Sequence, residues 1–443
     1  MTRLLVANDV PEQLVGAIPA MREALGWWAQ RLIWHMQDDD ILVLPTEPDA
    51  SCLKYVAKIT GTRHESLRVV VPPAGRAGAH NLSADRLADP GFRAAVRDAL
   101  GGRRLDAVLP LCPDASVVAL ARSLGAEGAV PGAAFASQSG GALANSKAVF
   151  RAVAAGAGVP VPEGSVVGDP LDAEDTIAEF LGRGVPVIVK KEYAQGCNGN
   201  ELLSPVAGVK PIGARRGLVL EGRTAIKRYV TESWDWLTNG ERHKVVVERY
   251  HPGSRAVFAE YVLTDQGVEL AGQGELVAAP MPDGQVLPAV GLAPVALAQL
   301  VDATRRLCEA VHALGYRGTL GPDAIVTPDG EILFTEYNGR ITGSTHIYAT
   351  VGARVVGKEA MRRRILLERQ GWTAPSFQVA VDRLFESGLA YNPATEVGIV
   401  LVSAFNPVYK VISYCIVAED LPAALELEER LDKVSPRARQ DQG

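Results

Sequence analysis

The stretch that most constrains the fold runs from residue 319 to 345, where two runs of β-branched and aromatic residues flank a turn. The turn, Thr-Pro-Asp-Gly at 327–330, has proline to preset the backbone and glycine to accept a positive φ, so we predict a β-hairpin. Folding the strands back from this turn brings Asp323 opposite the neighbourhood of Glu336. Asn338 then lies on the same face of its strand as Glu336.

The hairpin therefore gathers two carboxylates (Asp323 and Glu336) and an amide (Asn338) next to the guanidinium of Arg340. Such oxygen ligands suit Mg²⁺, which usually shares its coordination with a substrate phosphate. The alternative is an ordinary hairpin with an acidic outward face. The rest of the chain has to distinguish these two interpretations.

Composition excludes several classes of protein. The chain has 443 residues, enough for roughly three domains. Lys and Arg total 45 against 51 Asp and Glu, and no strongly basic segment is present, so a nucleic-acid partner is not expected. The N-terminal residues do not form a signal-peptide core, and no apolar run approaches the roughly 18 residues of a membrane span. Five scattered cysteines without a CxxC pair indicate reduced thiols and a cytoplasmic protein.

Residues 1–140 alternate short aliphatic runs with helical patterns, which predicts a doubly wound α/β domain with a mostly parallel sheet. Ligands bind such sheets beyond the carboxyl ends of the strands. The polar residues and proline at these ends are candidate substrate contacts, although ordinary loop polarity would explain them equally. They are Asn8, Asp9, Thr46, Glu47, Pro110 and Asp114.

Two lysines stand at the ends of predicted elements. Asn145 and Ser146 offer an N-cap for a helix to Ala155, and Lys147 lies in its first turn, where a cation gains nothing from the helix dipole unless an anion is near. Lys190 ends a strand over 185–191 and precedes a Gly/Asn-rich loop. The backbone N–H groups of such a loop can converge on one anion.

The middle of the chain is predicted to be less regular over 202–243. It could be a mobile lid, a substrate-specific insertion, or a solvated linker with two core tryptophans, Trp234 and Trp236. Strands follow near 244–250, 255–263 and 274–279. A long amphipathic helix over 295–314 then leads to the hairpin.

The C-terminal part begins with a predicted helical stretch from about 347 to 369. Two strands (397–404 and 411–417) and a helix over 421–434 then predict a small α+β unit.

In order and spacing, Lys147, Lys190 with its Gly-rich loop, Glu248 and the hairpin motif D-x12-E-x-N-x-R resemble the ATP-grasp superfamily of carboxylate–amine ligases. The resemblance covers about residues 130–350. It implies an N-terminal α/β (pre-ATP-grasp) domain over 1–140 and a two-lobed ATP-grasp domain over 141–370. Within the latter the lid subdomain would cover about 160–247 and the catalytic lobe about 248–370. A C-terminal α+β domain would follow over 371–443.

The resemblance also implies a role for each matching position. ATP would contact Lys147, Lys190, Gly196, Asn198, Gly199, Glu248, Arg249 and Tyr250. Two Mg²⁺ ions would bind Asp323, Glu336 and Asn338, with Arg340 and Lys190 as catalytic residues. Many members carry a ribose-binding acid where this chain has Arg255, so the ribose contact is unassigned. Arg255, Ser344, His346, Tyr348 and the tryptophans near 234 are candidate substrate contacts, with packing as the alternative for each.

A closer resemblance, to pheganomycin-type peptide ligases, is carried by TEYNGRITGSTHIY, by VVVERYHPGSRAV and by the C-terminal α+β unit. It implies that a guanidino-bearing amino acid is joined through an acyl phosphate to the N-terminus of a peptide in natural-product biosynthesis. The expected partners are a small-molecule acid and an amino acid or peptide. The alternatives are a non-catalytic ATP-binding module and a biotin-type carboxylase of the same superfamily. The C-terminal unit is a candidate interface for a homo-oligomer.

Overall fold

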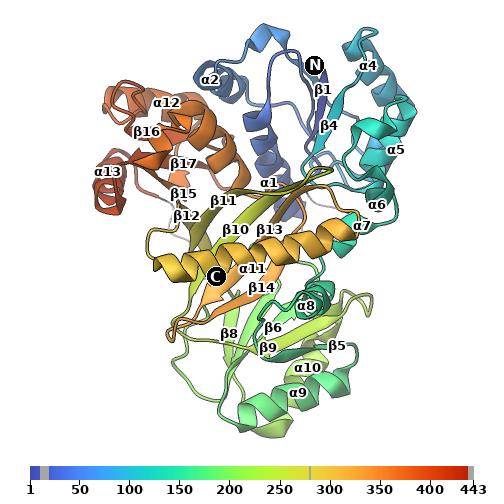
Figure 1. Ribbon diagram of the computed structural model, residues 1–443, viewed down its shortest axis with the longest axis vertical. Helices are drawn as coiled ribbons and strands as arrows, with labels where there is room; N and C mark the ends of the chain where they lie inside the picture. Colours follow the sequence, from blue (N-terminus) through green and yellow to red (C-terminus); the bar gives the residue numbers. More distant parts are fainter. Residues whose placement is uncertain (10–18, 279–280, 438–443) are drawn as a thin grey trace.

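The computed structural model describes residues 1–9, 19–278 and 281–437. Its N-terminal part is a parallel sheet with the strand order β3-β2-β1-β4, as the sequence predicts (Figure 1). The strands are β1 Arg3–Val6, β2 Ile41–Val43, β3 Arg68–Val70 and β4 Ala107–Pro110. The helices around them include α1 Pro19–Ala29, η2 Gln30–His35, η3 His64–Ser66, α2 Ala50–Thr60, α3 Ala84–Leu87, α4 Pro90–Leu100, α5 Ala115–Ser123 and η4 Glu127–Ala129.

Short helices lead from this sheet to the next part of the chain: α6 Ala133–Ser137, α7 Gly140–Leu143 and α8 Lys147–Gly156. The predicted N-cap of α8 is present, because the hydroxyl of Ser146 accepts a hydrogen bond from the backbone N–H of Val149 at 3.1 Å.

A five-stranded sheet with the order β5-β9-β6-β7-β8 forms the lower lobe in Figure 1. This lobe lies where the lid subdomain is expected and is called the lid below. Its strands are β5 Gly164–Val167, β6 Val187–Lys191, β7 Asn200–Ser204, β8 Arg216–Val219 and β9 Val245–Arg249. The helices α9 Pro170–Gly182 and α10 Gly222–Thr238 pack on it in a core of their own.

The prediction of irregular structure over 202–243 is wrong, because β7, β8 and α10 occupy most of it. The helix α10 buries Ile226, Tyr229, Val230, Trp234 and Leu237, which recur at helical spacing. Trp236 is half-buried, with the guanidinium of Arg215 3.7 Å from the centroid of its ring.

An eight-stranded sheet, β14-β13-β10-β11-β12-β15-β17-β16, forms the centre of the molecule. Its strands are β10 Arg255–Thr264, β11 Gly267–Ala278, β12 Pro282–Leu287, β13 Gly318–Val326, β14 Ile332–Asn338, β15 Ile365–Thr373, β16 Gly398–Leu401 and β17 Val411–Ala418. The long helix α11 Pro294–Ala313 crosses β10 and β11 (Figure 1). The helices α12 Phe377–Glu386 and α13 Leu421–Val434 accompany the last strands.

The predicted helical stretch over 347–369 is partly wrong. A π-helix, η5 Ile347–Gly357, and a short 3-10 helix, η6 Ala360–Arg362, are followed by the strand β15. Pairing of β15 with both β12 and β17 outweighs the helical propensity of the charged residues before it. The boundary expected at residue 370 falls inside β15, so the last strands extend the central sheet.

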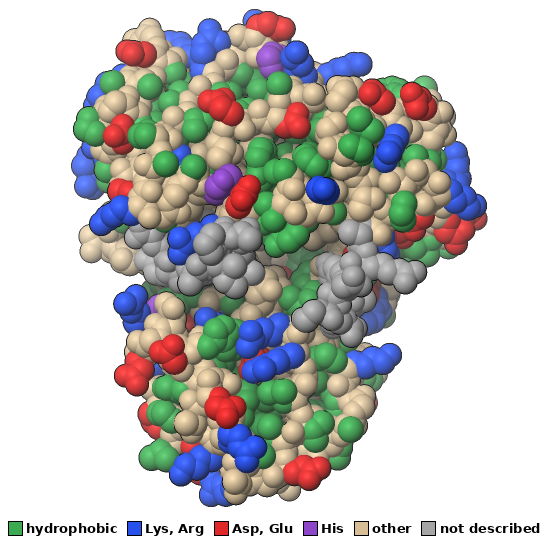
Figure 2. Space-filling view, turned by 180° about the vertical axis from the view of Figure 1, so that it is seen from behind, with side chains coloured by type: hydrophobic (Ala, Val, Ile, Leu, Met, Phe, Trp, Pro, Cys, Tyr) green, Lys and Arg blue, Asp and Glu red, His purple; other side chains and the backbone are tan. Residues whose placement is uncertain are grey.

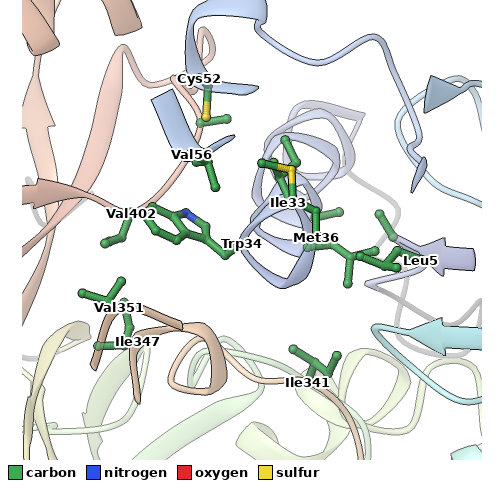
Figure 3. Packing of buried hydrophobic residues seen from close by; sticks show 14 of the residues in the cluster. Leu5, Ile33, Trp34, Met36, Cys52, Val56, Ile341, Ile347, Val351 and Val402 are labelled. Carbon is green, nitrogen blue, oxygen red and sulfur yellow. The ribbon is translucent and has the colours of Figure 1, made fainter. Parts of the chain in front are cut away.

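One apolar cluster joins the N-terminal sheet to the centre and the C-terminal strands (Figure 3). Trp34 is 1% exposed, and its ring lies beside Val402, which follows β16, on the side where the π-helix residues Ile347 and Val351 also lie. Ile341, directly after the hairpin, belongs to the same cluster.

Figure 2 shows, from behind, a waist between the lid subdomain and the rest of the molecule, with Lys and Arg side chains on the lid side of it. No helix within the described residues is both long enough and apolar enough to cross a membrane.

Candidate active site

The hairpin has the predicted register, with Asp323 opposite Glu336 and Gly321 opposite Asn338. At its turn Gly330 adopts a φ of 86°, the left-handed conformation that glycine accepts without strain. The side-chain amide of Asn338 donates to the Asp323 carboxylate at 3.0 Å. The three proposed metal ligands therefore lie together on one face.

Lys147 reaches this face from the first turn of α8. Its ammonium nitrogen lies 2.6 Å from a carboxylate oxygen of Glu336 and donates to the backbone carbonyl of Ala194 at 3.3 Å. Lys147 is 6% exposed, so the anion that its position in the helix required is the Glu336 carboxylate.

Lys190, at the end of β6, approaches the hairpin from the lid. Its ammonium lies 2.5 Å from Glu248 Oε1 and donates to the Thr335 carbonyl at 3.5 Å. The second oxygen of Glu248 accepts from Arg151 at 2.8 Å. Glu248 is 1% exposed, and this buried carboxylate is matched by two cations.

The two hairpin carboxylates titrate in opposite directions. Burial and the neighbouring Glu336 raise the pKa of Asp323 well above its ordinary value. Burial also acts against ionisation of Glu336, but the ammonium groups of Lys147 and Lys190 bring its pKa below the ordinary value.

This donor set fits a hard divalent cation, which would relieve the repulsion between the carboxylates. In the described part of the chain no three or more His, Cys, Asp or Glu side chains cluster as a metal site. Two carboxylates and an amide are therefore suited to an ion that takes its remaining ligands from phosphate and water.

Arg340 follows the hairpin and is held by the segment before α8. Its guanidinium donates to the side-chain oxygen of Asn145, whose amide donates to Gly141 O at 2.8 Å. The backbone N–H of Gly339 donates to Ala144 O at 2.9 Å. Arg340 is thus oriented by contacts about 195 residues away in sequence.

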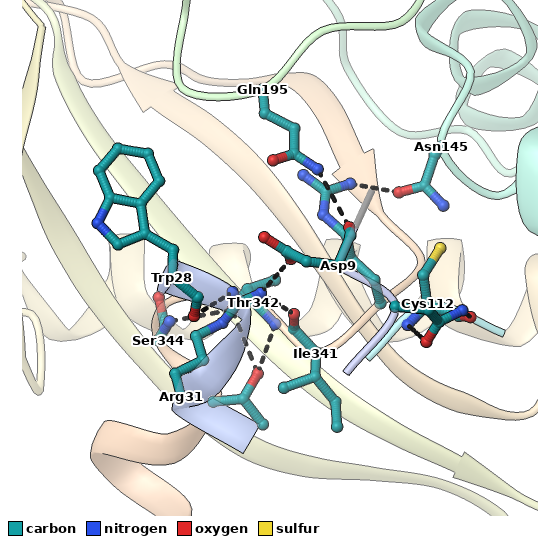
Figure 4. A network of polar contacts seen from close by, with 12 residues as sticks. Asp9, Trp28, Arg31, Cys112, Asn145, Gln195, Ile341, Thr342 and Ser344 are labelled. Atoms are coloured by element: carbon teal, nitrogen blue, oxygen red, sulfur yellow. Dashed lines mark hydrogen bonds and ion pairs between the residues drawn. The ribbon is translucent and has the colours of Figure 1, made fainter. Parts of the chain in front are cut away.

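The Gly-rich loop, residues 194–200, contacts Lys147 through the backbone carbonyl of Ala194. Within it, the amide of Asn198 donates to Gln195 O at 3.1 Å, and Gly196 has a φ of 58°. Gly199 lies close to Ala194, since a Cβ on Gly199 would meet the Cβ of Ala194 at 2.3 Å. Gln195 donates to the backbone carbonyl of Asp9 at 3.5 Å, so the loop touches the N-terminal domain (Figure 4).

The proposed adenine residues lie where the lid chain returns to the central sheet. The backbone N–H of Arg249 donates to Glu163 O at 2.7 Å, and that of Tyr250 donates to Pro186 O at 2.9 Å. The Tyr250 hydroxyl donates to Lys210 O at 2.8 Å.

Several candidate contacts have other partners. Arg255 pairs with Glu275 at 2.5 Å and donates to Gly291 O at 2.6 Å. Ser344 donates to the side-chain oxygen of Gln285 at 2.6 Å. The ring of His346 lies 3.1 Å from Val402 O, and burial lowers its pKa well below the ordinary value.

Most of the candidate substrate contacts at the strand ends of the N-terminal sheet have partners away from the Gly-rich loop. Asp114 is the N-cap of α5, and Asn8 donates to Cys112 O at 2.6 Å. Thr46 and Glu47 accept from Gln30, at 3.3 and 3.4 Å, and Pro110, the last residue of β4, stands opposite Val6 of β1. Asp9 alone among them contacts the Gly-rich loop.

Tyr348 and Trp234, two further candidate substrate contacts, also have partners within the fold. The Tyr348 hydroxyl donates to the buried carboxylate of Glu260. Trp234 is 8% exposed in the core of the lid.

Two residues that sequence reasoning passed over contribute to the site. Arg151 binds Glu248, and its position four residues after Lys147 on one helix face was the available signal. Asn145 was recognised only as a cap, and its contact with Arg340 depends on a long-range approach that spacing does not reveal.

Family models match two segments: the pre ATP-grasp domain over residues 29–126 and the PGM1 C-terminal domain over 379–431. A curated relative, L-propargylglycine–L-glutamate ligase of Streptantibioticus cattleyicolor, is 34% identical over 118 residues, 23% of this chain and 24% of the relative. The carbamoyl phosphate synthase large chain of Thermus thermophilus is 28% identical over 201 residues, 44% of this chain and 17% of the relative. The alignments thus span about a quarter or less of these relatives.

Solved structures match over almost the whole chain. N5-carboxyaminoimidazole ribonucleotide synthetase from Thermus thermophilus has a TM-score of 0.58 at 17% identity, covering 100% of both chains. Biotin carboxylase from Campylobacter jejuni has a TM-score of 0.60 at 15% identity, covering 98% of this chain and 91% of the other. At these identities the likeness establishes the fold.

Proposed function

Because this chain has the ATP-grasp fold, we propose that it is an ATP-dependent ligase that joins a carboxylate to an amine. One observation carries the proposal. Two lysine ammonium groups (Lys147 and Lys190) and a guanidinium act electrostatically on the carboxylate of Glu336, although these groups come from the lid, α8 and the segment after the hairpin. Glu336 stands opposite Asp323, whose carboxylate accepts from the amide of Asn338. Such a constellation can neutralise a triphosphate and the charge of phosphoryl transfer.

Each residue then has a role. Lys147, Lys190 and the loop residues Gly196, Asn198 and Gly199 would bind the phosphates of ATP. The adenine would lie against Glu248, Arg249 and Tyr250.

Two Mg²⁺ ions would be held by Asp323, Glu336 and Asn338, and would supply charge neutralisation when bound. Lys190 and Arg340 would stabilise the negative charge that develops on the transferred phosphoryl group.

The reaction proceeds in two steps. An oxygen of the substrate carboxylate attacks the γ-phosphorus of ATP, the bond to the β-phosphate oxygen breaks, and ADP leaves. The amine nitrogen then attacks the carbonyl carbon of the acyl phosphate, phosphate leaves with its bridging oxygen, and the amine loses a proton. No enzyme nucleophile is required. Burial raises the pKa of Cys197 to about 12, so its thiol stays protonated.

The substrates follow from the resemblance more than from the site. We propose a guanidino-bearing amino acid as the acid and an amino acid or peptide as the amine, in natural-product biosynthesis in the cytoplasm. The curated relative named for L-propargylglycine and L-glutamate supports a ligase acting on two amino acids. The match to the PGM1 C-terminal domain over residues 379–431 supports a relationship between this part of the chain and other proteins that carry that domain.

The test is ADP release measured with a panel of amino acids and short peptides, followed by mass analysis of the product. We expect release to require both an acid and an amine, and the product mass to equal their sum less one water. ADP release driven by bicarbonate, with a carboxylated product, would instead identify a carboxylase. ATP binding without turnover under any pairing would identify a non-catalytic module.

A further inference from the structure

Glu260, on β10, is a buried carboxylate to which the proposed chemistry gives no role. It is 1% exposed, and three hydroxyl groups donate to it. They belong to Thr342 and Thr345, each at 2.7 Å, and to Tyr348. A buried carboxylate is costly unless hydrogen bonds satisfy its oxygens, so these three donors stabilise its charge. All three lie in the segment that follows Arg340.

Glu260 lies on the same face of the central sheet as the proposed metal ligands. Gly321 of β13 stands opposite Asn338 of β14, and residues that stand directly opposite each other share one face of a sheet. A Cβ on Gly321 would lie 3.1 Å from Glu260 Oε2 and 3.6 Å from Thr342 Cγ2. The carboxylate of Glu260 and the side chain of Thr342 therefore lie over Gly321, on the face that carries Asn338.

The two threonine hydroxyls also fix the backbone of the segment. The hydroxyl of Thr342 accepts from the N–H of Ser344 at 3.1 Å, and that of Thr345 accepts from the N–H of Thr342 at 2.9 Å. Each hydroxyl thus links a backbone N–H group to Glu260, so a single carboxylate ends both hydrogen-bond chains. Thr342 and Ser344 are labelled in Figure 4.

Arg340 directly precedes this segment. The N–H of Ile341 donates to Leu111 O at 2.8 Å, and the next residue, Thr342, is held by Glu260. Burial raises the pKa of Glu260, whereas the hydroxyl groups and the guanidinium of Arg340 act in the opposite direction. The two side chains are therefore close enough to interact electrostatically.

Resting on the proposed ligase function, we propose that Glu260 is a positioning residue for Arg340. It holds the hydroxyl groups of the segment over residues 342–348, and this segment fixes the backbone from which the Arg340 guanidinium reaches the transferred phosphoryl group. A misplacement of about 1 Å can cost about 10²-fold in rate, so the shape of this segment bears directly on the chemical step. Glu260 acts through Arg340 and takes no part in making or breaking a bond.

The experiment is Glu260→Gln, which keeps the size of the side chain but replaces one acceptor oxygen by an NH₂ group that can only donate. We expect kcat to fall about 10–100-fold, while KM for ATP changes by less than about threefold. In the Arg340→Ala background the same substitution should lower kcat by less than about threefold, because its effect passes through Arg340. Equal losses of kcat in the two backgrounds would overturn the proposal.

The matched control is Glu428→Gln on α13, where a buried carboxylate likewise accepts from a tyrosine hydroxyl, that of Tyr414 at 3.1 Å. This variant should keep the native kcat. A fall in kcat equal to that of Glu260→Gln would overturn the proposal, because it would show a general effect of losing a buried carboxylate.

A pair of variants at Thr345 keeps Glu260 and decides the matter if Glu260→Gln does not fold. Thr345→Val removes the hydroxyl at nearly constant volume, whereas Thr345→Ser retains it. We expect kcat to fall about 10-fold in Thr345→Val and to stay within about threefold of the native value in Thr345→Ser. Equal kcat values in the two variants would overturn the proposal.

Chemical labelling separates this proposal from the ligase function. Phenylglyoxal modifies accessible guanidinium groups, and mass analysis of peptides gives the rate at each arginine. In Glu260→Gln and Thr345→Val the rate at Arg340 should rise at least about threefold, because a loosened segment exposes the guanidinium, while the rate at the exposed Arg305 stays constant. This result supports the positioning role even if no pairing of acid and amine yields ADP. An unchanged rate at Arg340 would overturn it even if amide synthesis is found.

Discussion

Lys147, Lys190 and Arg151 each hold a carboxylate of the site, so the positive charges that would meet a nucleotide are already paired. Arg340 differs, since its nearest partner is the neutral amide of Asn145. A guanidinium held by a neutral group keeps its charge for a substrate. This makes Arg340 the residue best placed to respond to charge that develops during the reaction.

Arg340→Ala should therefore lower kcat by about 10²–10³-fold while KM for ATP changes by less than about threefold. Initial rates of ADP release at saturating acid and amine measure both constants. Arg305→Ala, on the exposed face of α11, is the matched control. Parallel changes in kcat and in KM for ATP would contradict a role confined to the transition state.

Glu368 is only 6% exposed, and its burial raises its pKa to about 8. Between its ordinary value of 4.5 and about 8 the unfolded chain releases a proton that the folded chain keeps. Stability is therefore lost as the pH rises through this window, by at most about 5 kcal/mol.

Glu368→Gln should remove this loss, so the variant should gain stability over the native chain at pH 8 and little at pH 5. Urea unfolding at both pH values measures the difference. Glu179→Gln, at an exposed position with 70% of its side chain accessible, should leave the profile unchanged. An equal effect of Glu368→Gln at both pH values would contradict the assignment.

Among the elements, those with local signals were predictable. The cap at Ser146, the strand that ends in Lys190 and the hairpin each follow from residues within a few positions of one another. The strand β15 was missed because its partners β12 and β17 lie far away in sequence. The charged residues that precede β15 have high helix propensity, so the local sequence predicts a helix there.

The residues of the site likewise include some that the local sequence predicts and some that it does not. Asp323, Glu336 and Asn338 could be predicted from strand periodicity, since a register of two places them on one face. The contact of Arg340 with Asn145 could not, because it depends on how α8 approaches the hairpin.

The loop after β3 depends on a single side chain for its shape. Replacing Arg86 by lysine keeps the charge but leaves several of its five carbonyl partners unsatisfied, which should lower the free energy of unfolding by about 2–4 kcal/mol. Denaturant unfolding measures this loss. Arg122→Lys, in an exposed ion pair with Glu127, should cost less than about 1 kcal/mol. Similar losses for both variants would contradict the structural role of Arg86.

For the whole molecule, the central sheet makes the C-terminal unit part of the same folding unit. β15 pairs with β12 on one side and β17 on the other, and Trp34 packs on Val402. Sequence patterns suggested a separate small unit here, because secondary structure alone does not show which sheet a strand joins.

A chain ending at residue 370 would cut β15 and expose apolar residues that β17 covers. We expect it to be insoluble or to lack cooperative unfolding, and we expect the full chain to lose β15 and the N-terminal sheet in a single transition. Circular dichroism and scanning calorimetry of both chains check this. A soluble 1–370 chain with an unchanged Tm would show that the unit folds independently.

The lid has a core of its own, and so does the part of the centre formed by the hairpin, β10, α11 and α8. The N-terminal sheet shares a third core with β12, the π-helix and the C-terminal strands. Polar contacts connect the lid to the rest of the molecule across the site. Lys190 donates to the carbonyl of Thr335, and Glu248 pairs with Arg151. The Gly-rich loop forms hydrogen bonds with Lys147 and Asp9. Opening would therefore break a few hydrogen bonds and ion pairs and would leave each apolar core intact. Nucleotide exchange should accordingly accelerate with ionic strength, because screening by salt weakens the ion pairs that hold the lid closed.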